Sequence, residues 1–148
     1  LVANTYLKEL TELKEVYGNK DSIRVFFQID ERPLFTVGGS HYISELIHAC
    51  GGVNIFNDLS QLAPSVSVES VIIGDPEVIL TSASLKDKNK FEIWLRWPDI
   101  SANQLQNLYA IEADGLERPT TNLIKAALEI CQHLEESRSK RIGPHALD

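Results

Sequence analysis

The sequence predicts an α/β domain, a three-layer sandwich in which helices cover both faces of a mostly parallel central sheet. Short runs at 24–29, 78–83 and 108–111 are rich in β-branched and aromatic residues, which is typical of buried strands. Segments whose apolar residues recur at helical spacing lie between these runs. Strands and helices that alternate along a chain favour a parallel sheet with right-handed crossovers. The 148 residues, 43% of them hydrophobic, are enough to bury one core.

The amino-terminal part of the chain is predicted to contain two helices and a central strand. Apolar residues follow helical spacing from the first residue to Tyr17, and Gly18 tolerates the left-handed conformation that closes many helices. The run 24–29 then forms the central strand. A second helix starts near Ser40 and places Cys50 on its buried side before a pair of glycines ends it.

Two further helices are predicted around the strand at 78–83. A serine caps a short helix at 67–73, and another serine caps a helix at 84–97 that ends before a proline. In the second of these helices Phe91, Trp94 and Leu95 share one stripe. We expect this stripe to pack into the core.

The last helix of the chain carries apolar residues at helical spacing and places Cys131 on its inward face. It ends in a basic stretch formed by Arg138, Lys140 and Arg141. Cations suit the carboxyl end of a helix, so this stretch is interpreted as a solvated helix end. A flexible tail is expected to cover 138–148.

The composition argues against several classes of function. The formal net charge is −7 and the 14 Lys and Arg residues are scattered, so the chain lacks the clustered basic surface that a nucleic acid requires. No apolar run approaches the roughly 18 residues of a membrane-spanning helix. The signal-peptide pattern is also absent, and the chain opens within a helical pattern, which indicates a fragment or a processed product.

Common catalytic and metal-binding motifs are absent as well. The sequence contains no Gly-x-Ser-x-Gly elbow, no phosphate-binding loop with lysine and no Rossmann fingerprint. His41 and His48 have no companion acidic ligand motif, so the histidines are expected at the surface or at helix caps. Cys50 and Cys131 form neither a Cys-x-x-Cys pair nor a zinc spacing. Composition favours one long-range disulfide and two buried free thiols equally.

The carboxyl ends of the predicted strands indicate where a ligand binds. In open parallel sheets the binding edge lies beyond these ends, so the loops that follow the three strands should line one rim. The last of these loops carries Asp114, Glu117 and Arg118. Arginine makes bidentate contacts, and we interpret this group as ligand-contacting. Solvated loop charges are the alternative, whereas an acid pair for glycoside hydrolysis lacks a second carboxylate cluster.

Three segments carry motifs that occur together in one protein family. They read IDERPLFTVGGSHYISELIHACGGVNIF at 29–56, VSVESVIIGDPEVIL at 66–80 and EADGLERPTTNLIKAALEICQHL at 112–134. In this order they resemble the carboxyl-terminal lobe of periplasmic solute-binding proteins of the vitamin B12 (cobalamin) and siderophore type, which serve ABC importers. The resemblance covers most of the chain after residue 23.

The resemblance implies one lobe of a two-lobed binding protein with a helical backbone. Residues 1–18 would end the interdomain helix, 19–137 would form the α/β lobe and 138–148 the tail. The implied function is solute capture in the periplasm for ABC-transporter import, with cobalamin or a related corrinoid as the ligand and ferric siderophores or haem as alternatives. The lobe would have no catalytic activity and no resident cofactor, because cobalamin is the transported ligand. Its partners would be a membrane permease and the missing amino-terminal lobe.

The resemblance also assigns roles to individual residues. The implied ligand-contacting residues are an aromatic face and a rim segment: Phe35, Asp114, Gly115, Leu116, Glu117 and Arg118. Glu69 corresponds to the acidic residue that a lobe presents to the permease. Cys50 and Cys131 correspond to a pair that forms a disulfide in some members. The alternative hypothesis about function is that the chain is a non-catalytic α/β domain that associates with itself. It would then bury its exposed face in a homodimer.

Overall fold

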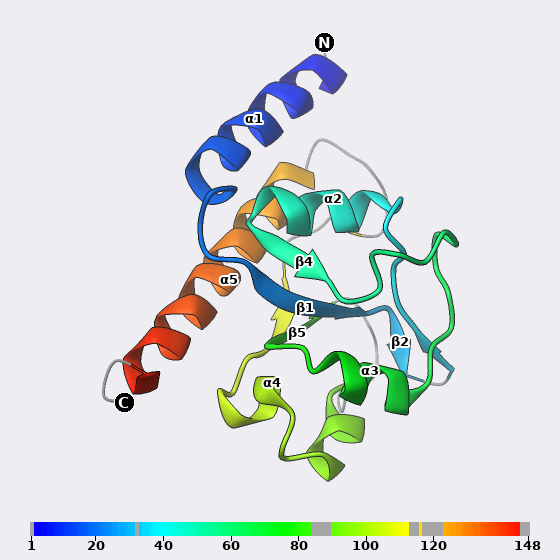
Figure 1. The fold of residues 1–148 in the computed structure, drawn as a ribbon. Coiled ribbons are helices and arrows are strands. Elements are labelled where there is room, and N and C mark those ends of the chain that lie inside the picture. The colour runs from blue at the N-terminus through cyan, green and yellow to red at the C-terminus, as the bar shows by residue number, and fades with distance from the viewer. Residues whose placement is uncertain (1, 32, 84–89, 113–115, 117–122, 146–148) are drawn as a thin grey trace.

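The computed structural model describes the following residues of the chain: 2–31, 33–83, 90–112, 116 and 123–145. Four parallel strands form the central sheet in the order β4-β1-β5-β6 (Figure 1). Their bounds are β1 Ile23–Gln28, β4 Gly52–Asn54, β5 Val78–Ser82 and β6 Leu108–Ile111. The three predicted strands are confirmed to within one residue at each end. The sequence missed β4, because its glycine was assigned only to the end of a helix.

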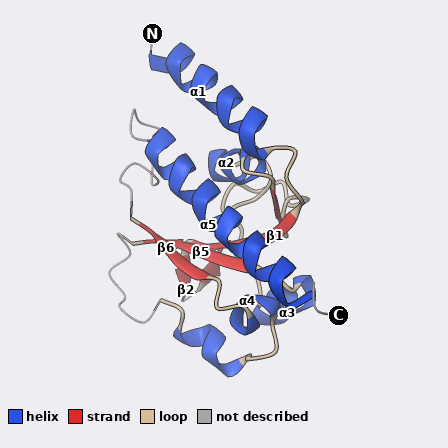
Figure 2. Cartoon of the chain, turned by 90° about the vertical axis from the view of Figure 1, so that its left-hand side faces the viewer, coloured by secondary structure: helices blue, strands red, loops and turns tan. Residues whose placement is uncertain are grey.

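Three helices cover one face of the sheet. They are α1 Val2–Tyr17, α2 Tyr42–Ala49 and α5 Leu123–His145. Val25 and Phe27 of β1 pack on this side with buried residues of all three helices. Figure 2 shows the strands between this group of helices and a second group.

A second group of short helices covers the opposite face. They are α3 Val68–Gly74, the 3-10 helix η1 Glu92–Arg96 and α4 Ser101–Gln104. Phe26 of β1 points to this side and meets the rings of Phe56 and Trp94 edge-on, at centroid distances of 5.8 and 5.7 Å. Successive residues of β1 therefore enter two different cores, and the predicted three-layer architecture is confirmed.

Side chains cap two helices at their first turns. The amide of Ser70 donates to Ser67 Oγ at 3.1 Å, which is the predicted cap of α3. At the start of α2, His41 Nδ1 accepts a hydrogen bond from the amide of Ile43 at 3.0 Å. Burial lowers the pKa of His41 and so favours the neutral ring that accepts this bond. The helix begins at Tyr42, slightly later than the predicted Ser40.

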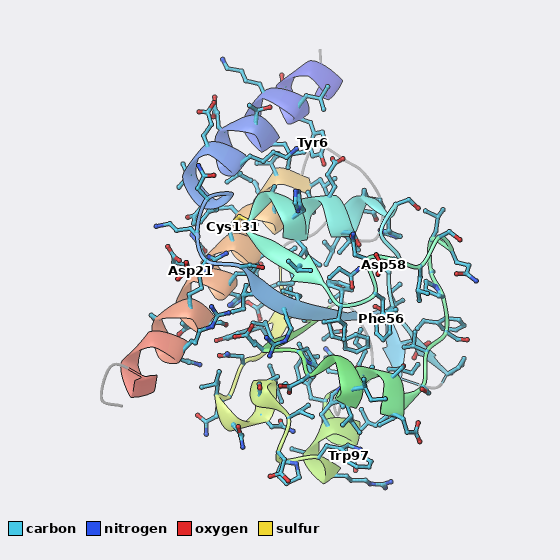
Figure 3. The ribbon with its side chains drawn as sticks, viewed as in Figure 1. Tyr6, Asp21, Phe56, Asp58, Trp97 and Cys131 are labelled. Atoms are coloured by element: carbon cyan, nitrogen blue, oxygen red, sulfur yellow. A yellow bond between two sulfur atoms is a disulfide. The ribbon has the colours of Figure 1, made fainter. Side chains whose placement is uncertain are left out.

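Tyr6 links α1 to α2. Its hydroxyl donates to the Glu45 carboxylate at 3.4 Å, and Figure 3 shows Tyr6 on the side of α1 nearer α2. Burial, together with the nearby Glu45 carboxylate, raises the pKa of Tyr6 to about 12. The phenol therefore keeps its proton and remains the donor of this contact at neutral pH. Leu7 and Val16 of α1 remain 56% and 60% exposed.

The structure corrects the helix predicted at 84–97. Residues 84–89 lie outside the described part of the chain, and the element that follows is the 3-10 helix η1. Trp94 is fully buried, as predicted, but Leu95 is 69% exposed, so its predicted place in the core stripe is wrong. Side chains three residues apart align in a 3-10 helix, which groups Phe91 with Trp94 and turns Leu95 away.

The structure also corrects the basic end predicted for the last helix. A solvated end and a flexible tail were expected from residue 138, but α5 continues to His145 and Arg138 is only 4% exposed. Its guanidinium donates to the carbonyl oxygens of Asp21 at 2.7 Å and Cys50 at 2.6 Å. The planar guanidinium satisfies acceptors from two separate segments, which explains its burial. Residues 146–148 lie outside the described residues.

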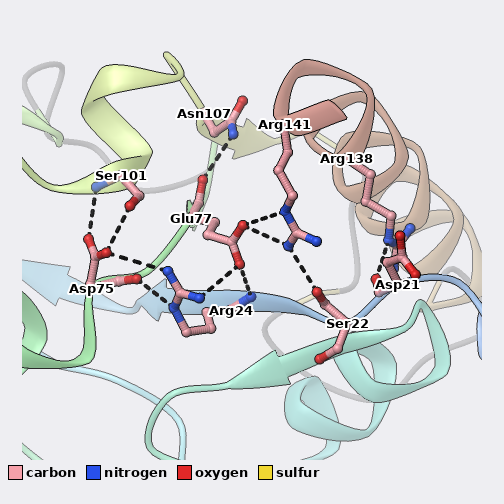
Figure 4. A network of polar contacts seen from close by, with 9 residues as sticks. All are labelled: Asp21, Ser22, Arg24, Asp75, Glu77, Ser101, Asn107, Arg138 and Arg141. Carbon is pink, nitrogen blue, oxygen red and sulfur yellow. Dashed lines mark hydrogen bonds and ion pairs between the residues drawn. The ribbon is translucent and has the colours of Figure 1, made fainter. Parts of the chain in front are cut away.

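A buried carboxylate fastens α5 to the amino ends of the strands (Figure 4). Glu77 is 6% exposed and precedes β5 directly. It accepts from Arg141 Nε of α5 at 2.7 Å and from the amide of Arg24 in β1 at 3.1 Å. Arg141 also donates to the carbonyl oxygen of Ser22 at 2.9 Å. Charge-assisted hydrogen bonds of this kind are stronger than neutral ones.

A disulfide joins Cys50, which ends α2, to Cys131 in α5. The two Cα atoms lie 4.7 Å apart, and both residues are fully buried. The bond that the family resemblance implied is therefore confirmed, and the alternative of two free thiols is wrong.

We expect no free thiol in unfolded, unreduced protein and two after reduction, as measured with Ellman's reagent. Reduction should lower the free energy of unfolding by roughly 4–5 kcal/mol, because the bond closes a loop with a sequence separation of 81 residues. Two free thiols before reduction would contradict the disulfide.

We also expect Glu77→Ala to lower the free energy of unfolding in urea by roughly 3 kcal/mol. The change leaves the Arg24 amide without its acceptor and Arg141 without its carboxylate. The matched control is Glu136→Ala on the exposed side of α5, which should change stability by less than about 0.5 kcal/mol. Equal effects of the two variants would show that the Glu77 contacts contribute nothing.

Candidate functional site

The candidate site lies at the carboxyl edge, which we define as the edge of the sheet where the four parallel strands end. Gln28, Ser82 and Ile111 are the last residues of β1, β5 and β6. A ligand site is expected beyond such an edge because the loops that leave it face a common space. The structure thus confirms that the segments after the three predicted strands start from one edge.

Phe35 lies in a small hairpin that follows β1 at this edge. The hairpin pairs β2 Asp30–Glu31 with β3 Leu34–Phe35 in an antiparallel ladder. The carbonyl oxygen of Phe35 accepts from the amide of Ile29 at 2.8 Å, so the hairpin folds back on the end of β1. The Phe35 side chain is half-buried. Phe35 is therefore partly accessible at this edge.

Gln28 organises the end of β1, and the sequence analysis missed it. Its side chain is fully buried, accepts from Trp94 Nε1 at 2.7 Å and donates to the carbonyl oxygen of Lys90 at 2.5 Å. Its carbonyl oxygen accepts from Thr81 Oγ1 at 2.7 Å. These bonds tie β1, β5 and the segment before η1 together. The one feature of the sequence that could have pointed to Gln28 is its position, as an amide side chain at the end of an apolar strand.

The structure places only one member of the predicted rim segment. Leu116 is 1% exposed and belongs to the core packed by α1, α2 and α5, so its predicted contact with a ligand is wrong for the side chain. An apolar side chain beside a core is more stable inside it than on a polar rim. The other members of that segment, namely Asp114, Gly115, Glu117 and Arg118, lie outside the described residues.

Glu69 is exposed in the first turn of α3. Just before this helix, the amide of Val66 donates to the carbonyl oxygen of Leu34 at 2.9 Å. Leu34 belongs to the hairpin at the carboxyl edge, so α3 starts near that edge and carries Glu69 close to it. A carboxylate in this position also interacts favourably with the helix dipole.

A surface cavity of about 380 Å³ lies away from the carboxyl edge. It is lined by residues at the end of α3 and in the η1–α4 region, including Asp75, Trp97 and Ile100. Asp75 forms an ion pair with Arg24 near the start of β1, so the cavity belongs to the opposite end of the sheet. Figure 3 shows Trp97 at the lower edge of the molecule, on the side where the short helices cover the sheet.

Two further features, a metal site and a membrane-spanning helix, were looked for among the described residues. None of them form a group of three or more His, Cys, Asp or Glu side chains suited to a metal ion. Within the described ranges, no helix combines the length and the hydrophobicity needed to cross a membrane.

Comparison with known proteins relates most of the chain to one group. No family model matches the sequence. The chain is 34% identical over 140 residues to the vitamin B12-binding protein of Vibrio parahaemolyticus, a match that covers 94% of this chain and 50% of that protein. It is 33% identical over 138 residues to the vitamin B12-binding protein of Salmonella typhi, with 90% and 48% covered. The chain thus spans about half the length of the curated relatives it matches.

Comparison with solved structures also relates the chain to a vitamin B12-binding protein. The crystal structure of the periplasmic vitamin B12-binding protein of Vibrio cholerae matches with a TM-score of 0.77 at 34% identity, over 92% of this chain and 53% of that chain. The periplasmic haem-binding protein of the same species matches at 0.74 with 18% identity, over 88% and 54%, and so supports the fold alone. By sequence and by fold, the chain is a homologue of the vitamin B12-binding proteins and has the architecture of one lobe of a periplasmic solute-binding protein.

Proposed function

We propose that this chain is one lobe of a periplasmic protein that captures cobalamin for an ABC importer. The observation that carries the proposal is the difference between two sets of relatives with similar folds. Vitamin B12-binding proteins of two Vibrio species are 34% and 36% identical to the chain, whereas two haem-binding proteins are 17% and 18% identical. Capture of haem or of a ferric siderophore is therefore the second candidate.

The proposed role is binding without catalysis. Phe35 at the carboxyl edge would give an apolar surface to the corrin ligand. Asp114, Glu117 and Arg118 would add acceptors and bidentate donors for its polar side chains. A large ligand needs a second wall to exclude water, and the missing amino-terminal lobe would supply it. The chain would then need no resident cofactor, because cobalamin is the cargo.

A membrane permease is the second partner in this proposal. Glu69 would contact it, because this carboxylate is exposed in the first turn of a helix that starts near the carboxyl edge. Docking beside the ligand edge would place the bound solute close to the transport path. The α1 helix would continue toward the amino-terminal lobe, with residues 1–18 as the end of the interdomain helix.

For the isolated chain we expect cyanocobalamin to bind with a dissociation constant weaker than about 1 µM, equivalent to less than about 8 kcal/mol. One wall of the cleft is absent, so contact area and exclusion of water are both reduced. Isothermal calorimetry tests this, with hemin and a ferric hydroxamate as competing ligands. Phe35→Ala should weaken binding about tenfold, while Trp97→Ala at the far end should leave it unchanged.

Nanomolar binding of cyanocobalamin by the 148-residue chain would contradict the two-lobe proposal, since the site would then be complete within one domain. Tighter binding of hemin than of cyanocobalamin would favour the second candidate.

Reversal of charge at Glu69 tests docking. In cells that import cobalamin through the protein containing this chain, Glu69→Lys should reduce uptake and leave the affinity for cyanocobalamin unchanged. The matched control is Glu92→Lys, also exposed in the first turn of a helix but on η1. If Glu69 serves only the helix dipole, uptake will persist and stability will fall by about 0.3–1 kcal/mol. Loss of ligand affinity in Glu69→Lys would also contradict a docking role.

A further inference from the structure

The cavity at the end of the sheet opposite the carboxyl edge has no part in the capture of cobalamin proposed above. Its volume of about 380 Å³ falls within the range of roughly 300–1,000 Å³ that is typical of small-molecule sites. Its walls come from the end of α3 and from the region of η1 and α4. All of the residues that line it belong to the described part of the chain. The cavity is thus large enough for a small molecule.

Trp97 supplies an aromatic part of the wall and is held through its backbone. Its amide donates to the carbonyl oxygen of Trp94 at 3.0 Å. Its carbonyl oxygen accepts from the amide of Ile100 at 3.3 Å and from Asn103 Nδ2 at 2.9 Å. Trp97 nevertheless remains 41% exposed. An accessible aromatic residue with a fixed backbone can bind a ligand with little further loss of conformational entropy.

Apolar and charged side chains share the rest of the wall. The apolar members are Ile72, Pro98 and Ile100, and the charged members Arg96 and Asp99 are both exposed. Among the described residues, no side chain forms a hydrogen bond or an ion pair with the side chain of Arg96 or Asp99. The guanidinium offers donors and the carboxylate offers acceptors. A ligand that carries both kinds of group can therefore pair with both residues.

The charges around the cavity balance one another. Asp75 also lines it, but its carboxylate is paired with Arg24 at 3.4 Å and accepts from the amide and the hydroxyl of Ser101, each at 2.8 Å. Arg96 and Asp99 add one charge of each sign. A ligand with a single net charge gains little from such a wall, because each attraction is offset by a repulsion. The wall therefore favours a neutral ligand.

We propose that this cavity is a site for a neutral carbohydrate, in which one sugar ring lies on Trp97 and its hydroxyl groups pair with Arg96 and Asp99. A pyranose ring presents C–H groups on its faces, and their slight positive charge suits the negative face of an aromatic ring. Sugar hydroxyl groups both donate and accept, as the two charged side chains require. The site is separate from the carboxyl edge, so this inference does not depend on the capture of cobalamin.

An NMR titration of the whole chain tests the site. The probes are methyl β-D-glucopyranoside and N-acetylglucosamine, with choline and acetate as charged comparisons. At least one of the sugars should shift the indole N–H signal of Trp97 with a millimolar dissociation constant, because the cavity leaves one side of the ligand in water. The indole signal of Trp94 should not move, since this residue is fully buried and its Nε1 donates to Gln28. Tighter binding of choline or acetate than of both sugars would overturn the assignment to a neutral ligand.

Substitutions then show whether the cavity itself binds the sugar, with binding followed through the backbone amides around it. Trp97→Ala should weaken binding at least fivefold, and Trp97→Phe should weaken it less because an aromatic ring remains. Asp99→Ala should weaken binding about threefold through the loss of an acceptor. The matched control is Leu95→Ala, because Leu95 is 69% exposed on the same 3-10 helix but does not line the cavity. This variant should bind like the unchanged chain. The absence of any shift with either sugar at about 100 mM, or an equal loss in Trp97→Ala and Leu95→Ala, would overturn the proposal.

Discussion

Burial of β1 on both faces is the constraint on which the rest of the structure depends. Phe26 enters the core under α3 and η1, whereas Val25 and Phe27 enter the core under α1, α2 and α5. A strand of this kind must lie inside a sheet, and β4 and β5 flank it as parallel neighbours. Parallel neighbours require crossover connections, which place helices on both faces. The three layers, and the common edge at which we propose that a ligand binds, both depend on the burial of this one strand.

A strand buried on both faces must find its hydrogen-bond partners within the protein. The two ends of β1 meet this requirement with different chemistry. Gln28 at the carboxyl edge uses uncharged bonds to Trp94 and Lys90, whereas Arg24 at the amino end shares the charged contacts of Glu77. Among the residues that the structure describes, no buried side-chain nitrogen or oxygen lacks a partner. At the carboxyl end of β1, the contacts of Gln28 thus join the strand to the segment around η1 through uncharged groups.

Local patterns in the sequence predicted those structural features that are determined by residues close together in the chain. The strand runs and the cap at Ser67 are of this kind, and so is the buried Trp94. Contacts between distant segments were not predictable in the same way. The sequence alone predicts a solvated cation at Arg141, because its partner, Glu77, is 64 positions away. The position of Leu116 was missed for a related reason, since its charged neighbours suggested a wholly exposed rim and gave no sign of an anchor. The disulfide was predictable only from the family resemblance, because spacing alone did not pair the cysteines.

The disulfide has a geometric consequence beyond stability. Cys50 ends the helix that begins with Tyr42, and Cys131 lies two positions after Glu129 in α5. The covalent bond therefore connects α2, in which the Tyr42 hydroxyl donates to the carbonyl oxygen of Leu116, to α5, in which the Glu129 carboxylate accepts from the amide of Glu112. Oxidation of the thiols fixes the spacing between these two helices near the bond. Oxidising conditions during folding therefore help to set the positions of two helices that contact the segment after β6. Neither sulfur atom lies at the carboxyl edge itself.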